Sequence, residues 1–213
     1  MPKKNNDGFI IEEQSDEEKA IPFKTKIKNE AFDWLHIFSV VIVVIILLFT
    51  FVLKPATIEG TSMENTLLEN QKVLITNLFY KPQYGDVVVI SRNVDNTYKN
   101  GTERSNLPII KRVIATENQT VDINFEKGIV YVDGVALDEP YVKTPTNLKY
   151  DIDFPVTVEK GCIFVLGDNR NVSLDSRSSQ IGKDGMIDTR YILGHVVCRV
   201  FPLDKFGPLP KYN

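Results

Sequence analysis

The sequence predicts an all-β domain of antiparallel sheets tethered by one N-terminal transmembrane helix, and three features of the chain lead to that prediction. Residues 34–53 contain no charged side chain. After Pro55 the chain becomes a series of short runs rich in β-branched residues, separated by turn-forming residues. Asp133-Gly134 lies between two such runs, and this pair is typical of the tight turn of a β-hairpin.

The uncharged run is long enough to cross a membrane. A helix of this length covers about 30 Å, which matches the hydrocarbon thickness of a bilayer. A cleaved secretory signal is the alternative, but its apolar core usually has about 7 to 15 residues and is followed by a small-x-small cleavage site. Here the run is longer and is followed by Lys54-Pro55. We therefore predict an uncleaved anchor helix over residues 33–53.

The lysines near the two ends of this run predict its orientation. More of them precede the run than follow it: Lys19, Lys24, Lys26 and Lys28 before, Lys54 and Lys72 after. The more basic flank of an anchor usually stays in the cytoplasm. We therefore expect residues 1–32, which are polar and charge-dense, to be a disordered cytoplasmic tail, and residues 54–213 to form an extracytoplasmic domain.

The segment after the anchor is dominated by predicted strands. They fall at residues 72–76, 87–91, 109–115, 121–125, 128–137, 162–166 and 192–200. No helical period extends over three turns in this part of the chain, which indicates an antiparallel β domain. Two polar stretches, 92–107 and 141–154, are expected to be loops.

Composition narrows the possible functions. The net charge is −3 and the basic residues are scattered, which is not the pattern of a nucleic-acid-binding surface. Cys162 and Cys198 lie in apolar strand-like runs, so we expect small buried side chains, and the sequence does not decide whether they form a disulfide. No Cys/His cluster indicates a metal site.

Ser62, in the stretch GTSMENTL (60–67), raises the question of a nucleophile. A serine hydroxyl is a weak nucleophile and needs a base within hydrogen-bond reach. His195 is the one histidine after the anchor, but it lies in the apolar run ILGHVVCRV, where a structural role is the better interpretation. A Ser-His-Asp arrangement would have to use it.

Lys111 is the second candidate base. Side chains alternate along a strand, so Ile109, Lys111 and Val113 share one face, and the lysine has apolar neighbours. Burial of this kind lowers the pKa of a lysine from its usual value of about 10.4 and favours the neutral amine, which can accept a proton. Arg112 faces the other side and does not lose its proton in proteins. Arg112→Lys is therefore expected to leave most of the activity.

A third segment, GDNRNVSLDSRS (167–178), is a polar loop directly after an apolar strand. Four motifs occur in order: SMENTL (62–67), YGDVVVI (84–90), IIKRVIA (109–115) and GDNRNVSLDSR (167–177). In this combination, from the anchor to about Phe201, the chain resembles the bacterial type I signal peptidases, membrane-bound Ser/Lys endopeptidases, in their single-anchor form.

The resemblance implies a role for several residues. Ser62 would be the nucleophile, Lys111 the general base, and Ser173 the residue that orients the lysine. The other implied members of the site are an ion pair of Asp175 with Arg177 and a turn made by Gly167, Asp168 and Asn169.

The chain departs from the family pattern in its loops. Asn65 stands where the family usually has proline, and ATENQT (115–120) stands where a Gly-Leu-Pro-Gly-Asp stretch is usual. Some relatives place a hydroxyl two residues before the nucleophile, where this chain has Gly60. The backbone N–H of Ser62 is therefore expected to be the main oxyanion donor.

The resemblance also implies the substrate and partners. These would be signal-peptide-bearing pre-proteins, with small residues at the last and third-last positions before the cut, and the lipid bilayer of a bacterial cell membrane. The peptide would add as a strand beside residues 57–61 and 108–111. The residues expected to bind it are Ile58, Gly60, Met63, Leu67 and Ile110. A monomer is expected, with no cofactor, no metal and no nucleic acid.

Three alternatives are weaker. A soluble Ser/Lys autoprotease of the SOS-repressor kind would carry a DNA-binding N-terminus, and an endoplasmic-reticulum-type signal peptidase would use histidine in place of Lys111. A non-catalytic membrane-anchored binding or assembly factor with a degraded peptidase domain is disfavoured because Ser62 and Lys111 are both intact. The sequence leaves open whether the substrates are general exported proteins or a dedicated set such as pilus subunits.

Overall fold

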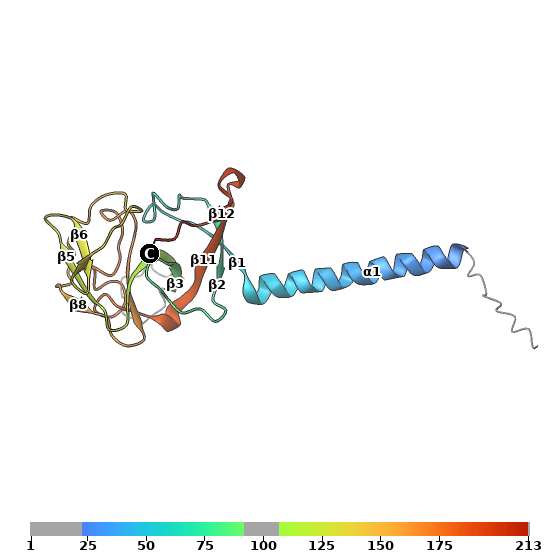
Figure 1. Cartoon of the computed structure of the whole chain (residues 1–213), viewed down its shortest axis with the longest axis horizontal. Helices are drawn as coiled ribbons and strands as arrows, with labels where there is room; N and C mark the ends of the chain where they lie inside the picture. Colours follow the sequence, from blue (N-terminus) through green and yellow to red (C-terminus); the bar gives the residue numbers. More distant parts are fainter. Residues whose placement is uncertain (1–22, 92–106, 213) are drawn as a thin grey trace, which may run out of the picture. The chain divides into compact units, whose positions relative to one another are not determined.

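The computed structural model describes residues 23–91 and 107–212, and the chain divides into two compact units, residues 1–46 and 47–213. The first unit is the helix α1 (Phe23–Leu47), which is followed by a π-helical turn, η1 (Leu48–Val52) (Figure 1). Residues Glu30–Val52 are long and apolar enough to cross a membrane, judged by length and composition. A helix suits that environment because it satisfies its own backbone hydrogen bonds.

The helix begins ten residues before the predicted anchor. Residues 23–32 contain neither glycine nor proline, so nothing in them stops the helix from extending toward the N-terminus. The expected disordered tail therefore overlaps the helix over these residues. Residues 1–22, which make up the rest of that prediction, lie outside the described residues.

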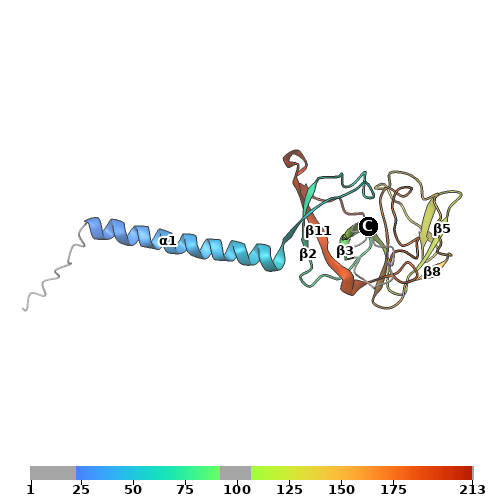
Figure 2. The ribbon, with the colours of Figure 1, turned by 180° about the vertical axis from the view of Figure 1, so that it is seen from behind.

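The second unit is built from antiparallel strands in two sheets, which confirms the predicted fold class. The main sheet has the order β1-β2-β11-β3-β4-β9-β10, with β12 also paired to β11, and the smaller sheet has the order β7-β6-β5-β8. Figure 2 shows β2, β3 and β11 gathered in one part of this unit and β5 and β8 in another. The strands are β1 (Lys54–Thr57), β2 (Lys72–Thr76), β3 (Val87–Ile90), β4 (Ile109–Thr116), β5 (Thr120–Asn124), β6 (Ile129–Val132), β7 (Val135–Ala136), β8 (Val156–Thr157), β9 (Cys162–Leu166), β10 (Ile187–Asp188), β11 (Ile192–Phe201) and β12 (Gly207–Pro208).

The β6–β7 hairpin has the turn that the sequence predicts. Asp133 and Gly134 have φ angles of 50° and 79°. A two-residue primed turn requires positive φ at both central positions, and the pair Asp-Gly tolerates it. The strands missed by the sequence analysis, β1, β8, β10 and β12, have two to four residues. Their residues are too few to show an alternating pattern, so pairing with neighbouring strands defines them.

Strand β4 lies where the core clusters of the domain meet. Its residues Ile110, Val113 and Ile114 belong to three different clusters of buried apolar side chains. All of its residues except the first and the last are buried. A polar side chain on β4 is consequently held in a dry environment, which bears directly on Lys111 and Arg112.

The cysteines are free and half-buried. They lie in β9 and β11, which are separated in the main sheet by β4 and β3. Three strand spacings of about 4.8 Å each exceed the Cα separation of up to about 7 Å that a disulfide allows. The fold therefore keeps Cys162 and Cys198 apart.

Candidate active site

The candidate nucleophile lies in a loop that joins β1 to β2. The Ile58 N–H donates to the Gln71 carbonyl at 2.8 Å, and the Asn70 N–H donates to the Ile58 carbonyl at 2.9 Å, which closes the base of the loop. Two apolar side chains, Met63 and Leu67, are 1% and 0% exposed and hold it to the core. Ser62, beside the first of these, is half-buried. The loop thus fixes its backbone while keeping the serine accessible.

Lys111 reaches Ser62 from β4. Its Nζ lies 2.8 Å from the Ser62 Oγ and also donates to the Ile110 carbonyl at 2.9 Å. The lysine is 3% exposed. A primary amine within hydrogen-bond distance of a serine hydroxyl can remove its proton when the amine is neutral, and burial favours the neutral form.

Ser62 and Lys111 lie on the wall of a cleft of about 460 Å³. The described residues that complete its lining are mostly apolar: Lys54, Pro55, Ala56, Thr57, Ile58, Glu59, Ile75, Val89, Leu107, Pro108, Ile109, Ile110 and Leu193. They come chiefly from β1 and the two residues that follow it, and from the start of β4 with the residues before it.

Both strands that border the cleft leave an edge open among the described residues. β1 pairs with β2. The first residues of β4 pair with β3, but its pairing with β9 begins at Arg112. Residues 109–111 therefore have backbone groups directed away from β3 toward the cleft, which is the arrangement that an added strand uses.

The predicted substrate-binding residues separate into two groups. Ile58 and Ile110 line the cleft. Met63 and Leu67 belong to the same core cluster as Ile58 and Ile110, but they are 1% and 0% exposed and are not among the described residues of the cleft lining. Gly60 is exposed, has a φ of 77°, and is not among the described residues of the cleft lining. We therefore do not assign Met63, Leu67 or Gly60 to substrate contact.

Gly167 and Asn169 shape the backbone around Ser62. A Cβ on Gly167 would lie 2.2 Å from the Ser173 Oγ and 2.6 Å from the Ser62 carbonyl oxygen, so this position requires glycine. The Asn169 N–H donates to the same Ser62 carbonyl at 3.0 Å, and its Nδ2 donates to the Thr61 carbonyl at 3.1 Å. The 167–169 turn is thereby hydrogen-bonded to the backbone of the nucleophile loop at Thr61 and Ser62.

Ser173 is fully buried beside this turn. Its Oγ has no hydrogen-bond partner among the described residues. A buried hydroxyl without a partner is uncommon, because desolvation of a polar group is costly unless a hydrogen bond offsets it. The hydroxyl is thus available to a partner near Ser62, and its predicted role in orienting Lys111 stays a prediction.

Three buried arginines of the described residues support the site, each with a carboxylate. The pairs are Arg112 with Asp168, Arg170 with Glu139, and Arg177 with Asp175, at closest distances of 2.7, 2.6 and 2.8 Å. The last pair is the one that the family resemblance implies. The other two pairs were not predicted from the sequence. A buried arginine on β4 needs a carboxylate, and the acidic residues of the polar loop 167–178 were candidates for it.

Arg112 is more deeply integrated than the sequence suggests. Its guanidinium donates twice to Asp168, at 2.8 and 2.7 Å, once to the Gly85 carbonyl at 2.7 Å, and once to the Thr66 Oγ1 at 3.1 Å. The Tyr141 ring covers it, with the guanidinium carbon 4.1 Å from the ring centroid. Lysine cannot reproduce this planar set of donors. The structure therefore changes the expectation that Arg112→Lys is tolerated.

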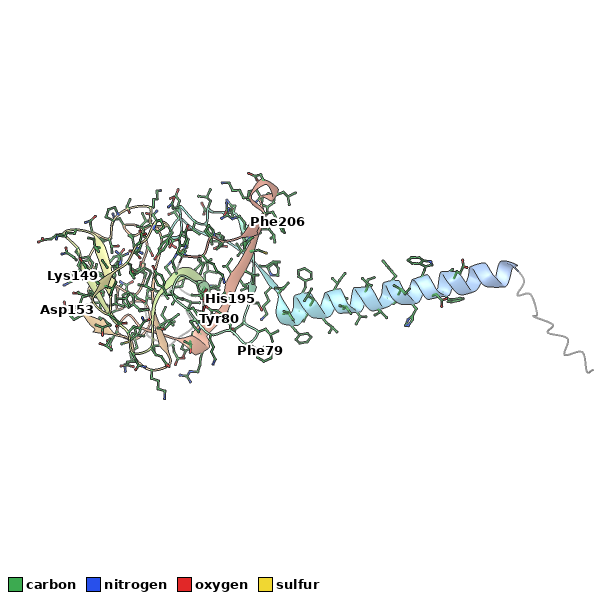
Figure 3. The ribbon with its side chains drawn as sticks, in the orientation of Figure 1. Phe79, Tyr80, Lys149, Asp153, His195 and Phe206 are labelled. Atoms are coloured by element: carbon green, nitrogen blue, oxygen red, sulfur yellow. The ribbon has the colours of Figure 1, made fainter. Side chains whose placement is uncertain are left out.

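His195 lies in a different depression of the surface from Ser62. Its ring stacks on Tyr80 with a centroid separation of 4.2 Å and an interplanar angle of 17°, and Figure 3 shows the two side chains close together. The Tyr80 hydroxyl donates to Asp86 at 2.8 Å, and burial, with the Asp86 carboxylate, raises the pKa of this hydroxyl. These contacts are those of a structural histidine.

The described residues were also compared with the side-chain groups that bind metal ions. Across residues 23–91 and 107–212, no group of three or more His, Cys, Asp or Glu side chains gathers as metal ligands would. The chemical capacity of the site rests on a serine, a buried lysine and their hydrogen-bonding frame.

Comparisons with known proteins identify the family of the chain. The family model described as "Signal peptidase, peptidase S26" matches residues 31–201. A "Signal peptidase IB" of Staphylococcus aureus (strain MRSA252) is 31% identical over 206 residues, which cover 87% of this chain and 95% of that protein. A "Probable signal peptidase I-1" of Synechocystis is 35% identical over 182 residues, which cover 84% of this chain and 87% of that protein.

A solved structure is also similar, a crystal structure of a signal peptidase I from Enterococcus faecalis V583. It shares 28% identity, with 55% of this chain and 97% of that chain covered and a TM-score of 0.39. The family assignment depends on the sequence matches. Because the family model spans most of the chain and the curated relatives exceed 30% identity over most of both lengths, this chain belongs to the signal peptidase family, peptidase S26.

Proposed function

We propose that the protein is a membrane-bound serine endopeptidase that removes N-terminal signal peptides from exported pre-proteins, with Ser62 as nucleophile and Lys111 as general base. The observation that carries this proposal is the 2.8 Å separation of the Lys111 Nζ and the Ser62 Oγ, with the lysine 3% exposed and both residues on one cleft. A degraded, non-catalytic domain would have no reason to keep this geometry.

The reaction proceeds through an acyl-enzyme. The neutral Lys111 amine takes the Ser62 proton while the Oγ bonds to the peptide carbonyl carbon, giving a tetrahedral oxyanion. The C–N bond then breaks, and the Lys111 ammonium returns a proton to the leaving amine. In the second half, Lys111 takes a proton from water, the hydroxyl adds to the acyl carbon, and the Ser62 oxygen leaves and regains the proton.

The oxyanion needs preorganised donors, and we assign the backbone N–H of Ser62 as the main one. Gly60 has no side chain that could help. The nucleophile loop is anchored by Met63 and Leu67 and held by Asn169, so this N–H has a fixed direction. Loss of one such donor typically costs about 10²–10³ in rate, which makes the loop geometry decisive.

Ser173 is proposed to orient Lys111. Its buried Oγ has no hydrogen-bond partner among the described residues, and Gly167 lets it approach the backbone of Ser62 closely. A small rotation of the side chain would offer the hydroxyl oxygen to the Lys111 amine. The resulting hydrogen bond would fix the direction of the lysine lone pair toward Ser62.

The cleft is proposed to bind the cleavage region of the signal peptide as an added strand. The open edges of β1 and of residues 109–111 supply backbone partners, and Ile58 and Ile110 line shallow apolar walls. The relatives are named signal peptidases. By that family membership, small side chains at the last and third-last positions before the cut fit these walls.

The protein is membrane-anchored through its N-terminal apolar helix. We propose that residues 33–53 span the membrane with the N-terminus cytoplasmic and residues 54–213 outside, because lysines are more numerous before the span. Protease added to intact protoplasts should degrade the catalytic domain and leave a protected fragment that ends near the anchor. Protection of the whole chain from the protease would show that the orientation is the opposite of the proposed one.

The central experiment is cleavage of a reporter pre-protein by the full chain in detergent micelles. Wild type should release the mature reporter, and Ser62→Ala should release none. A reporter with a large residue at the last position before the cut serves as the substrate control and should stay intact. Cleavage by Ser62→Ala at the wild-type rate would refute the assignment.

A further inference from the structure

Residues 207–212 follow the part of the chain that the family model matches, which ends at residue 201. They extend to Arg112, whose hydrogen bonds lead to the backbone of Ser62. We call them the 207–212 segment. Its first residues form β12, which pairs with β11 at Cys198 and Arg199. Leu209 then packs against the core cluster that contains Met63 and Leu67, beneath the nucleophile loop. The segment is therefore fixed to the main sheet and to the core cluster that anchors this loop.

The segment brings Tyr212 to Arg112. The Tyr212 ring centroid lies 5.4 Å from the guanidinium carbon of Arg112 and 4.9 Å from the ring centroid of Tyr141. Aromatic rings at these distances attract a cation and exclude water from its hydrogen bonds. Two rings thus cover Arg112, and one of them is supplied by the 207–212 segment.

Gly85 makes room for this approach. A Cβ on Gly85 would lie 2.6 Å from the Tyr212 carbonyl oxygen, and the residue has a φ of 86°. The Gly85 carbonyl in turn accepts a hydrogen bond from the Arg112 Nη1 at 2.7 Å. The backbone of Tyr212 and the guanidinium of Arg112 are therefore both seated on the same glycine.

Arg112 connects to Ser62 by two routes. Its two bonds to Asp168 hold the turn whose next residue, Asn169, donates to the Ser62 carbonyl at 3.0 Å. Its bond to the Thr66 Oγ1 at 3.1 Å holds the far side of the nucleophile loop. A shift of the guanidinium would consequently reach the backbone of Ser62 from both sides.

Asn65 gives a third connection. Its Nδ2 donates to the Tyr141 carbonyl at 3.0 Å, which ties the nucleophile loop to the ring that covers Arg112. Asn65 has a φ of 103°, whereas proline is fixed near −65°. At this position, where the family resemblance implies proline, the chain holds the loop by a hydrogen bond to its surroundings and not by a rigid ring.

We propose that Tyr212 is a positioning residue for Ser62 that acts through Arg112, with the 207–212 segment as a strap across the back of the site. The activity part of this inference rests on the proposed function. The ring face, not the hydroxyl, is the part that acts, because the contacts of Tyr212 with Arg112 and Tyr141 are made by its ring.

The test compares four variants of the full chain in detergent micelles: Tyr212→Ala, Tyr212→Leu, Tyr212→Phe and, as the exposed neighbour, Lys211→Ala. Tyr212→Ala and Tyr212→Leu should lower kcat by about fivefold to thirtyfold, the range expected when a desolvated cation loses an aromatic face. KM should stay within about twofold, because Tyr212 does not contribute to the described cleft lining and a positioning loss falls on kcat. Tyr212→Phe and Lys211→Ala should keep wild-type kcat.

Amide hydrogen exchange on the same variants gives a readout without activity. Exchange in residues 62–67 and 167–170 should be faster in Tyr212→Ala than in Lys211→Ala, with the second sheet unchanged. If the wild type failed to cleave the reporter, the proposed function would fall while this exchange pattern still decided the strap. Unchanged exchange, wild-type kcat in Tyr212→Ala, or equal losses in Tyr212→Phe and Tyr212→Ala would each overturn the inference.

Discussion

Buried arginines and a buried lysine lie at the candidate site, and they differ in the contacts that hold them. Arg112, Arg170 and Arg177 each donate to a carboxylate. Lys111 has contacts with neutral oxygens, those of the Ser62 hydroxyl and the Ile110 carbonyl. A carboxylate stabilises the charged form of its partner, whereas a neutral oxygen serves an amine in either protonation state.

This difference separates the structural role of the arginines from the proposed catalytic role of Lys111. The arginines are permanently charged, and their carboxylates offset the cost of burying that charge. The pairs of Arg112 with Asp168 and of Arg170 with Glu139 link the 167–178 loop to its surroundings, and the pair of Arg177 with Asp175 braces the loop internally. A catalytic base needs the opposite, a cation that loses its proton readily. Burial thus favours a neutral amine, whereas the paired carboxylates stabilise the arginine charges against the same burial.

Removing the lysine amine should have the largest effect. Lys111→Ala should lower kcat/KM by about 10²–10⁴-fold or more, because the general base is lost. Its melting temperature should not fall in proportion, since the variant also removes a buried polar amine whose desolvation is costly. Lys127→Ala, at an exposed turn of the second sheet, is the matched control and should cleave normally. Reporter cleavage by Lys111→Ala at the rate of that control would show that another group is the base.

Breaking a buried arginine pair should mainly cost stability. Asp175→Asn leaves Arg177 buried without its counter-charge, and such a loss typically costs about 3–5 kcal/mol of unfolding free energy. Chemical denaturation measures this change. The control is Asp153→Asn, because Lys149 and Asp153 form a pair whose side chains are 51% and 98% exposed (Figure 3). That control should change stability by less than about 0.5 kcal/mol.

A result in which Asp175→Asn and Asp153→Asn lost the same stability would remove the distinction between buried and exposed pairs.

Arg112→Lys tests whether the buried pairs depend on the shape of the guanidinium as well as on its charge. This variant keeps the charge but not the planar donors, so it should lose both stability and activity, contrary to the expectation from strand alternation alone. Wild-type activity in Arg112→Lys would restore that simpler expectation.

The pH dependence should identify the base. Lys111 must be neutral to accept the Ser62 proton, so activity is present above its folded-state pKa and is lost as the pH falls through it. A free lysine titrates near about 10.4, so a lysine base predicts that kcat/KM on a short peptide still rises above about pH 7. A histidine base would give an acid limb near about 6.5. The profile of His195→Ala should match the wild type, and an acid limb that disappears in this variant would make His195 the base.

Ser173→Ala should have the smallest effect. The hydroxyl is proposed to give Lys111 one hydrogen bond, worth about 0.5–1.5 kcal/mol, so kcat should fall by roughly two- to thirteenfold. The Oγ has no hydrogen-bond partner among the described residues, so its removal should leave the melting temperature nearly unchanged. A large loss of stability with full activity would make Ser173 a structural residue and remove it from the site.

Much of the fold followed from local patterns in the sequence. The uncharged run indicated a helix of membrane-spanning length, runs of β-branched residues indicated β2, β4 and β11, and Asp133-Gly134 indicated the hairpin turn. These features could be predicted because each depends on residues close together in the chain, through helix length, strand alternation or turn geometry. Ser62 and Lys111 were found in the same way, with the order of motifs joining them.

The tertiary structure decided which distant groups meet. The packing of strands far apart in the sequence decides which carboxylate Arg112 binds and which aromatic rings cover it, including that of Tyr212. It also decides whether Met63 and Leu67 line the cleft or anchor the loop. Alternation assigns a side chain to a face of a strand but not to a neighbour on that face. The sequence therefore determined the candidate reactive residues and most of the elements that carry them. Their partners were decided by long-range packing, because a buried charge takes the counter-charge that the fold brings within reach.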